Sequence, residues 1–139
     1  MTLGAAMRIL IVQHDSGLAD FWANFLEKQG ATVLQALGKE EAIRNLRFSN
    51  FDAIVLEIDL PDGGAISISD YATYRKPDIP IIAVSRKSFF SDSTIFELIP
   101  NARSLMREPV HIGDLAAILE HYGSMPGTAT EAGPVDATV

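Results

Sequence analysis

Residues 51–64 read Phe-Asp-Ala-Ile-Val-Leu-Glu-Ile-Asp-Leu-Pro-Asp-Gly-Gly, and this stretch decides the fold. An apolar run from Ala53 to Leu56 ends at Glu57 and passes into a turn rich in Asp, Pro and Gly. Such a run predicts a buried parallel strand with a carboxylate at its C-terminal end. Ligands and chemistry usually lie at that edge of an open α/β sheet. We therefore expect Glu57 at the centre of a site.

The rest of the chain repeats this pattern. Apolar runs at 7–12, 31–37, 79–84 and 103–107 predict four more strands. Helical spacing of apolar residues predicts helices from Leu18 to Gly30 and over 39–48, 65–76, 89–99 and 112–122. Strands that alternate with helices over short loops predict a doubly wound α/β fold. We expect a five-stranded parallel sheet in the flavodoxin-like strand order 2-1-3-4-5.

These elements predict one domain over residues 7–123 of the 139-residue chain. A short extension, residues 1–6, precedes it. Residues 124–139 are rich in Gly, Ala, Thr and Pro without periodicity, so we expect a disordered tail. The sequence has no apolar run of about 20 residues and no signal-peptide pattern, which predicts a cytoplasmic protein without membrane contact.

Composition excludes several kinds of chemistry. The chain has no cysteine, so disulfides, thiolate catalysis and cysteine-ligated metals are excluded. The formal net charge is −7, which argues against a direct nucleic-acid surface, because phosphate binding requires clustered Lys and Arg. Protein partners are therefore favoured.

Polar residues end four of the predicted strands: Gln13 with His14, then Glu57, Ser85 and Glu108. These positions resemble those of the receiver domain of two-component response regulators. The resemblance runs from about Arg8 to Tyr122 and includes the runs 9–12, 52–61 and 79–85 and the motif Glu108-Pro109-Val110. In that family an acidic pair after the first strand binds Mg²⁺, and an Asp that ends the third strand accepts a phosphoryl group. A Ser or Thr ends the fourth strand, and a Lys before a Pro ends the fifth. The resemblance also implies a cis peptide bond between Glu108 and Pro109.

Most of the family's functional residues are replaced in this chain. Gln13 and His14 stand at the acidic pair, where neither supplies the carboxylate that Mg²⁺ prefers, and Asp15 lies one place too far along. Glu57 stands at the phosphoacceptor position. Its extra methylene moves the carboxylate by roughly a bond length, and in-line attack is sensitive to a misplacement of about 1 Å. Glu108 stands where the family has its Lys, which reverses the local charge.

Ser85 matches the family's hydroxyl, but Leu105 replaces its switch aromatic. Phosphoryl transfer depends on positioning and charge neutralisation, so loss of metal ligands, acceptor and cation together should abolish it. We interpret the chain as a pseudo-receiver, which is not an enzyme, holds no metal or cofactor, and acts through protein–protein interaction independently of Asp phosphorylation. The alternative is a phosphorylatable receiver in a phosphorelay that uses a displaced acid, Asp59 or Asp15.

Other readings of the strand ends fit poorly. His14 lacks the flanking residues of a cobalamin-binding loop, and residues 13–17 are too acidic for a flavin phosphate loop. Ser85 lacks the Gly-x-Ser-x-Gly turn of a hydrolase nucleophile.

We also hypothesise that Arg86 or Lys87 pairs with Glu57 and closes the pocket; alternatively, both cations are solvated at the surface.

The resemblance implies an interface on the fourth helix, fifth strand and fifth helix. Its partners would be other signalling proteins, such as a histidine kinase or regulator components, or a second copy in a homodimer. The candidate residues are Phe89, Phe90, Arg103, Arg107 and Asp114.

Overall fold

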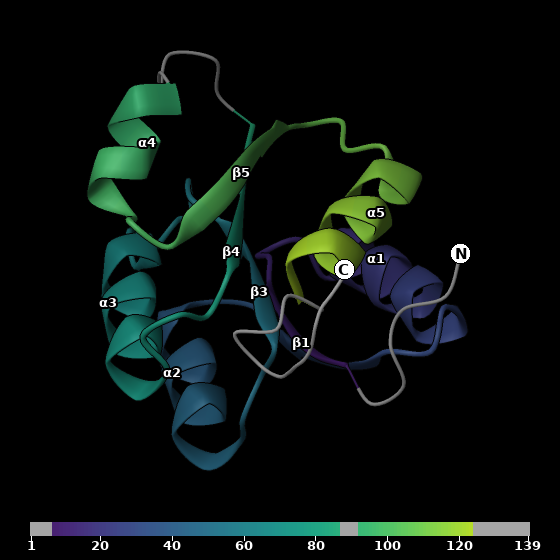
Figure 1. The fold of residues 1–139 in the computed structure, drawn as a ribbon, viewed down its shortest axis with the longest axis horizontal. Coiled ribbons are helices and arrows are strands. Elements are labelled where there is room, and N and C mark those ends of the chain that lie inside the picture. The colour runs from purple at the N-terminus through teal and green to yellow at the C-terminus, as the bar shows by residue number, and fades with distance from the viewer. Residues whose placement is uncertain (1–6, 87–91, 124–139) are drawn as a thin grey trace, which may run out of the picture.

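The computed structural model describes residues 7–86 and 92–123, which form a sheet with helices on both faces (Figure 1). The strands are β1 (Arg8–Val12), β2 (Thr32–Ala36), β3 (Ala53–Glu57), β4 (Ile81–Ser85) and β5 (Ala102–Arg107). The helices are α1 (Ser16–Lys28), α2 (Lys39–Phe48), α3 (Ala65–Arg75), α4 (Asp92–Leu98) and α5 (Ile112–Gly123). Within these residues, no helix is both long and apolar enough to cross a bilayer.

The strands are all parallel and lie in the order β2-β1-β3-β4-β5. The predicted fold class and strand order are therefore confirmed. Figure 1 shows α1 and α5 on one face of the sheet and α2, α3 and α4 on the other. The C-terminal ends of β1, β3, β4 and β5 consequently meet at one edge, as the sequence pattern predicts.

Two apolar clusters hold the layers together, one on each face of the sheet. One contains Leu56 and Ile68 and lies against α2, α3 and α4, and the other contains Trp22 and Leu119 and lies against α1 and α5. Trp22 is 1% exposed. Full burial of one large apolar side chain contributes about 1.5–3 kcal/mol, so these clusters fix the positions of the strand ends. Every residue of β3 is buried, including Glu57.

Element boundaries differ slightly from the predictions. The fourth strand begins at Ile81 rather than at residue 79, and β5 begins one residue early, at Ala102. The first helix begins at Ser16, because the Asp15 carboxylate caps it by accepting a hydrogen bond from Leu18 N. The predicted start of the fourth helix, residues 89–91, lies outside the described residues. The peptide bond between Glu108 and Pro109 is cis, as predicted.

The loop that follows β3 is fastened to the N-terminus of α2. Asp62 Oδ2 accepts a hydrogen bond from Lys39 N at 2.8 Å, and Oδ1 accepts one from Gly64 N at 2.9 Å. Gly38, at the N-cap of α2, has no side chain to do this. A Cβ at Gly64 would lie 2.5 Å from Lys39 Cβ, so the close approach requires glycine. Asp62 therefore supplies the cap of α2 from a distant part of the chain.

Candidate functional site

Glu57 lies at the C-terminal end of β3 and is 0% exposed. His14, two residues after β1, donates its backbone N–H to Glu57 Oε1 at 3.0 Å. The His14 ring also lies against the carboxylate, with Nδ1 at 2.8 Å from Oε1 and 2.9 Å from Oε2. The parallel pairing of β1 with β3 brings these two residues together. Both oxygens of Glu57 therefore contact His14.

Arg86 makes the second contact with Glu57. Its Nε lies 3.3 Å from Glu57 Oε2 and 3.6 Å from Asp59 Oδ2. Arg86 N also donates to Asp59 Oδ2 at 2.9 Å, so Asp59 orients this residue from the turn after β3. The pair between Arg86 and Glu57 that we hypothesised is thus present, whereas Lys87 lies outside the described residues.

Burial of a carboxylate is costly unless opposite charge and hydrogen bonds compensate it. Glu57 meets this requirement with the Arg86 guanidinium, the His14 ring and the His14 backbone N–H. Arg86 is 43% exposed, so water screens its contribution in part. The result is an anion that protein groups satisfy on both oxygens.

Glu108 brings a further carboxylate to the same edge, at the end of β5. Burial raises the pKa of Glu108, and the nearby Glu57 carboxylate raises it further. Gln13 and Arg86 act in the opposite direction. Gln13 lies close enough to affect the Glu108 carboxyl, but the two side chains do not form a well-aligned hydrogen bond. Gln13 Nε2 and Glu108 Oε2 both have no hydrogen-bond partner within the described residues. Gln13 Oε1 instead accepts from Asp15 N at 3.1 Å.

The structure thus brings together Gln13, His14, Glu57, Arg86 and Glu108. The Asp15 carboxylate is used elsewhere, as the cap of α1. Ser85 is fully buried at the end of β4, where its carbonyl accepts from Glu108 N at 2.9 Å. Leu105 is half-buried and packs against the apolar cluster under α4.

Two features of the site were absent from the predictions. The sequence does not predict the contact of His14 with Glu57, because the resemblance places His14 at a lost metal ligand and not beside the carboxylate. It also does not predict that Asp59 orients Arg86, since the alternative reading makes Asp59 a displaced acceptor. One sequence signal points to this role of Asp59. It lies two residues after Glu57, and the neighbouring strand, which ends at Ser85, is followed directly by Arg86.

Among the described residues, no group of three or more His, Asp and Glu side chains is arranged to hold a metal ion. In this site Gln13 and His14 occupy the positions of the acidic pair, and neither side chain supplies a carboxylate. Mg²⁺ prefers carboxylate oxygens and water in octahedral geometry.

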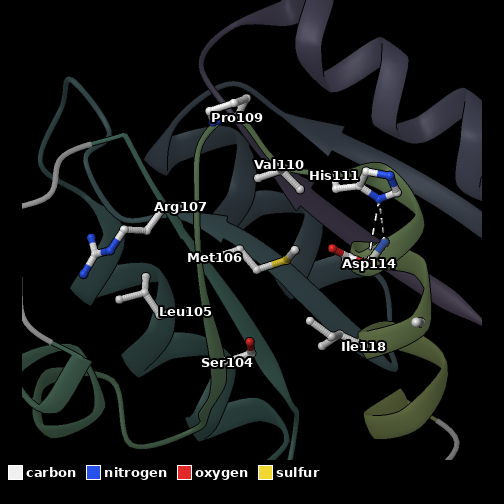
Figure 2. A pocket seen from close by; sticks show the side chains of 10 residues that line it. Ser104, Leu105, Met106, Arg107, Pro109, Val110, His111, Asp114 and Ile118 are labelled. Atoms are coloured by element: carbon white, nitrogen blue, oxygen red, sulfur yellow. Dashed lines mark hydrogen bonds and ion pairs between the residues drawn. The ribbon is translucent and has the colours of Figure 1, made fainter.

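The candidate interface lies on β5 and α5. Met106, Val110 and Ile118 line a hollow of about 510 Å³ between the two elements, and Leu105 and Arg107 point to the other side of β5 (Figure 2). Asp114 is exposed on α5, where its Oδ1 lies 3.8 Å from His111 Nδ1. Arg103 and Arg107 are exposed on β5. Phe89 and Phe90 lie outside the described residues.

The strand order, with helices on both faces and a site at the strand ends, is that of a doubly wound α/β domain. The family model "Response regulator receiver domain" matches residues 9–120. The chain belongs to this family, whose members function in two-component signalling.

Two transcriptional regulatory proteins are similar to most of the chain. The transcriptional regulatory protein PrrA of Mycobacterium leprae is 26% identical over 139 residues, which cover 95% of this chain and 59% of PrrA. The KDP operon transcriptional regulatory protein KdpE of Escherichia coli is 30% identical over 112 residues, 80% of this chain and 48% of KdpE. The chain spans about half the length of these two relatives.

Solved structures agree with the fold. The non-phosphorylated HemR receiver domain of Leptospira biflexa has a TM-score of 0.76 at 27% identity, covering 86% of this chain and 96% of that one. A CheY-like receiver domain protein of Methanospirillum hungatei has a TM-score of 0.77 at 24% identity, covering 86% and 94%.

Proposed function

We propose that this receiver domain acts in signal transduction by binding other proteins, without phosphorylation of an aspartate. The observation that carries the proposal is Glu57, a buried carboxylate at the acceptor position that is paired with both His14 and Arg86. An acceptor must present a free oxygen for in-line attack on phosphorus. Here protein groups contact both oxygens.

The surrounding residues support the same proposal. Phosphoryl transfer requires cations that neutralise the charge on the transferred group. Glu108, in the position of the family's Lys, instead adds negative charge beside Glu57, and burial with this repulsion raises the pKa of Glu108. Arg86 is already paired with Glu57 and Asp59.

A phosphorelay receiver that uses a displaced acid is less well supported. The Asp59 side chain is 3% exposed, and its Oδ2 accepts from Arg86 N. The Asp15 carboxylate caps α1. Both acids therefore have structural roles that phosphorylation would disrupt.

We place the partner surface on α4, β5 and α5. Arg103 and Arg107 present positive charge from β5, and Asp114 presents negative charge from α5. Such opposite charges suit a signalling protein, for instance a histidine kinase or regulator component, or a second copy of the chain. One relative, similar over 78 residues, is the CAI-1 autoinducer sensor kinase/phosphatase CqsS of Vibrio cholerae. The proposal includes no enzyme activity, cofactor, direct nucleic-acid binding or membrane contact, and it places the protein in the cytoplasm.

Incubation with Mg²⁺ and acetyl phosphate tests the proposal. We expect no gain of mass, and no change in the NMR spectrum on addition of Mg²⁺ and beryllofluoride. The Burkholderia pseudomallei response regulator, whose structure contains a phosphorylated aspartic acid, is the positive control. A matched variant, Gln13→Asp/His14→Asp/Glu57→Asp/Glu108→Lys, shows whether restored ligands permit the reaction. A phosphoryl adduct on the natural chain, lost in Asp59→Asn or Asp15→Asn, would establish the alternative.

A further inference from the structure

The last turns of α2 and α3 form a surface far from Glu57. Both helices run opposite to the strands, so their C-termini lie at the edge where the strands begin. The two helices pack side by side on one face of the sheet (Figure 1). Their last turns carry Phe48, which is 74% exposed, and Tyr74, which is 81% exposed. These are the two most exposed large apolar side chains of the described residues.

Three arginines lie on the same two helices, close in sequence to these aromatic side chains. Arg44, Arg47 and Arg75 are exposed and form no ion pair within the described residues. The Arg47 guanidinium carbon lies 5.9 Å from the centre of the Phe48 ring, a cation–π distance. A groove of about 370 Å³ runs along α2 beside this pair, and its lining residues are Lys39, Glu40, Ile43, Arg44, Arg47 and Phe48.

Two further cations near these helix ends, Arg8 and Lys76, have structural roles. Arg8 Nε donates to Asn50 O at 2.8 Å, and Lys76 Nζ donates to Phe51 O at 3.1 Å. These bonds hold the connection from α2 to β3 in place. The backbone next to Phe48 is therefore held in place by Arg8 and Lys76. Arg44, Arg47 and Arg75 take no part in these bonds.

The local charge is opposite to that of the whole chain. The groove presents three cations and one carboxylate, whereas the protein carries a formal net charge of −7. Arginines without an ion pair in residues 7–86 and 92–123, beside exposed aromatics, match an acidic segment with apolar side chains between its acids, because both kinds of contact form at once. Nucleic acid fits less well, because a continuous phosphate backbone requires a longer run of clustered Lys and Arg than these three arginines provide.

We propose that the surface formed by Arg44, Arg47, Phe48, Tyr74 and Arg75 docks an acidic, partly apolar segment of a partner protein. This goes beyond the binding proposed for β5 and α5, since it concerns a different part of the molecule. It holds whether or not the domain accepts a phosphoryl group.

An NMR titration of the full, ¹⁵N-labelled chain tests this proposal. The probe is a short synthetic peptide in which Glu and Asp alternate with Leu and Phe. We expect shifts at the ends of α2 and α3, and binding that weakens with added salt. Arg44→Glu/Arg47→Glu should weaken binding about tenfold or more, and Phe48→Ser should also weaken it.

Two matched controls accompany these variants. Lys28→Glu makes the same kind of charge change at an exposed site on α1 and should leave the affinity unchanged. A peptide with Lys in place of Glu and Asp should not bind. Circular dichroism verifies that each variant is folded.

Four results would overturn the proposal: no shifts at these helix ends, equal binding of the Lys peptide, tighter binding of a single-stranded oligonucleotide, or a homodimer that Phe48→Ser dissociates. The last result would make a second copy the occupant. None of them bears on the acetyl phosphate experiment, so the two proposals fail separately.

Discussion

Glu57 differs from an ordinary buried acid in the variety of its partners. A permanent cation, an imidazole and a backbone N–H all contact one carboxylate. Truncation of His14 or Arg86 leaves the buried Glu57 carboxylate with less compensation, which costs more than the contact itself contributes. Among the described residues, Oε2 of the neighbouring Glu108 has no hydrogen-bond partner.

The raised pKa of Glu108 predicts a pH dependence of stability. The folded state holds this proton more tightly than the unfolded state, so protonated Glu108 favours folding at low pH. This contribution is lost as the pH rises above the ordinary value of 4.5 and through the raised pKa. The variant Glu108→Gln has no carboxyl group to titrate. The free energy of unfolding of this variant minus that of the natural chain should therefore increase as the pH rises from 4.5 through the raised pKa of Glu108.

Urea unfolding at a series of pH values from acid to neutral measures this difference. The control is Glu27→Gln, at an exposed site on α1. Parallel pH profiles for the natural chain and Glu108→Gln would contradict the prediction.

At the scale of elements, the order and type of every described helix and strand could be predicted from the sequence. Apolar periodicity and Gly stops such as Gly30, which has a φ of 107°, carry this information locally.

The pair of Arg86 with Glu57 could also be inferred, because adjacent strand ends bring them together. The contact of His14 with Glu57 could not, because it depends on the ring orientation after β1. The cap that Asp62 supplies to α2 joins residues 23 apart, beyond the reach of local patterns.

The junction of α2 with the loop after β3 predicts opposite effects for two Gly→Ala variants. At Gly64 the new methyl would lie 2.5 Å from Lys39 Cβ, so Gly64→Ala should destabilise the protein by about 1–3 kcal/mol. At Gly17, in the first turn of α1, the nearest atom would be 3.5 Å away, an ordinary contact. Gly17→Ala should therefore stabilise by up to about 1 kcal/mol, because alanine favours helix. Urea unfolding compares both, and equal effects would show that the close approach at Gly64 is unimportant.

For the whole molecule, the sheet separates three regions. The strand-end site lies at the C-terminal edge of the sheet. The surface formed by Arg44, Arg47, Phe48, Tyr74 and Arg75 lies at the C-terminal ends of α2 and α3, and the exposed residues of β5 belong to an edge strand. The two apolar clusters connect these regions. Because the regions lie apart, a small partner on one of them leaves the other two accessible.

The interface on β5 predicts the effect of a charge reversal. Arg103→Glu should weaken binding at this face about tenfold, because a positive contact becomes repulsive. If the partner is a second copy, the mean mass from light scattering should fall toward that of one chain, 15.1 kDa. If it is a histidine kinase, the affinity in a direct titration should fall. Lys28→Glu is the matched control, and equal effects of both variants would remove β5 from the interface.

The cap that Asp62 provides for α2 also bears on the order in which the chain is made. During synthesis, residues 39–48 leave the ribosome before Asp62, so α2 emerges without its cap. The helix gains this cap once β3 is in the sheet and the following loop has turned back. Completion of α2 is thus coupled to insertion of the central strand, and a nascent chain that ends before residue 62 carries an α2 that frays at its first turn.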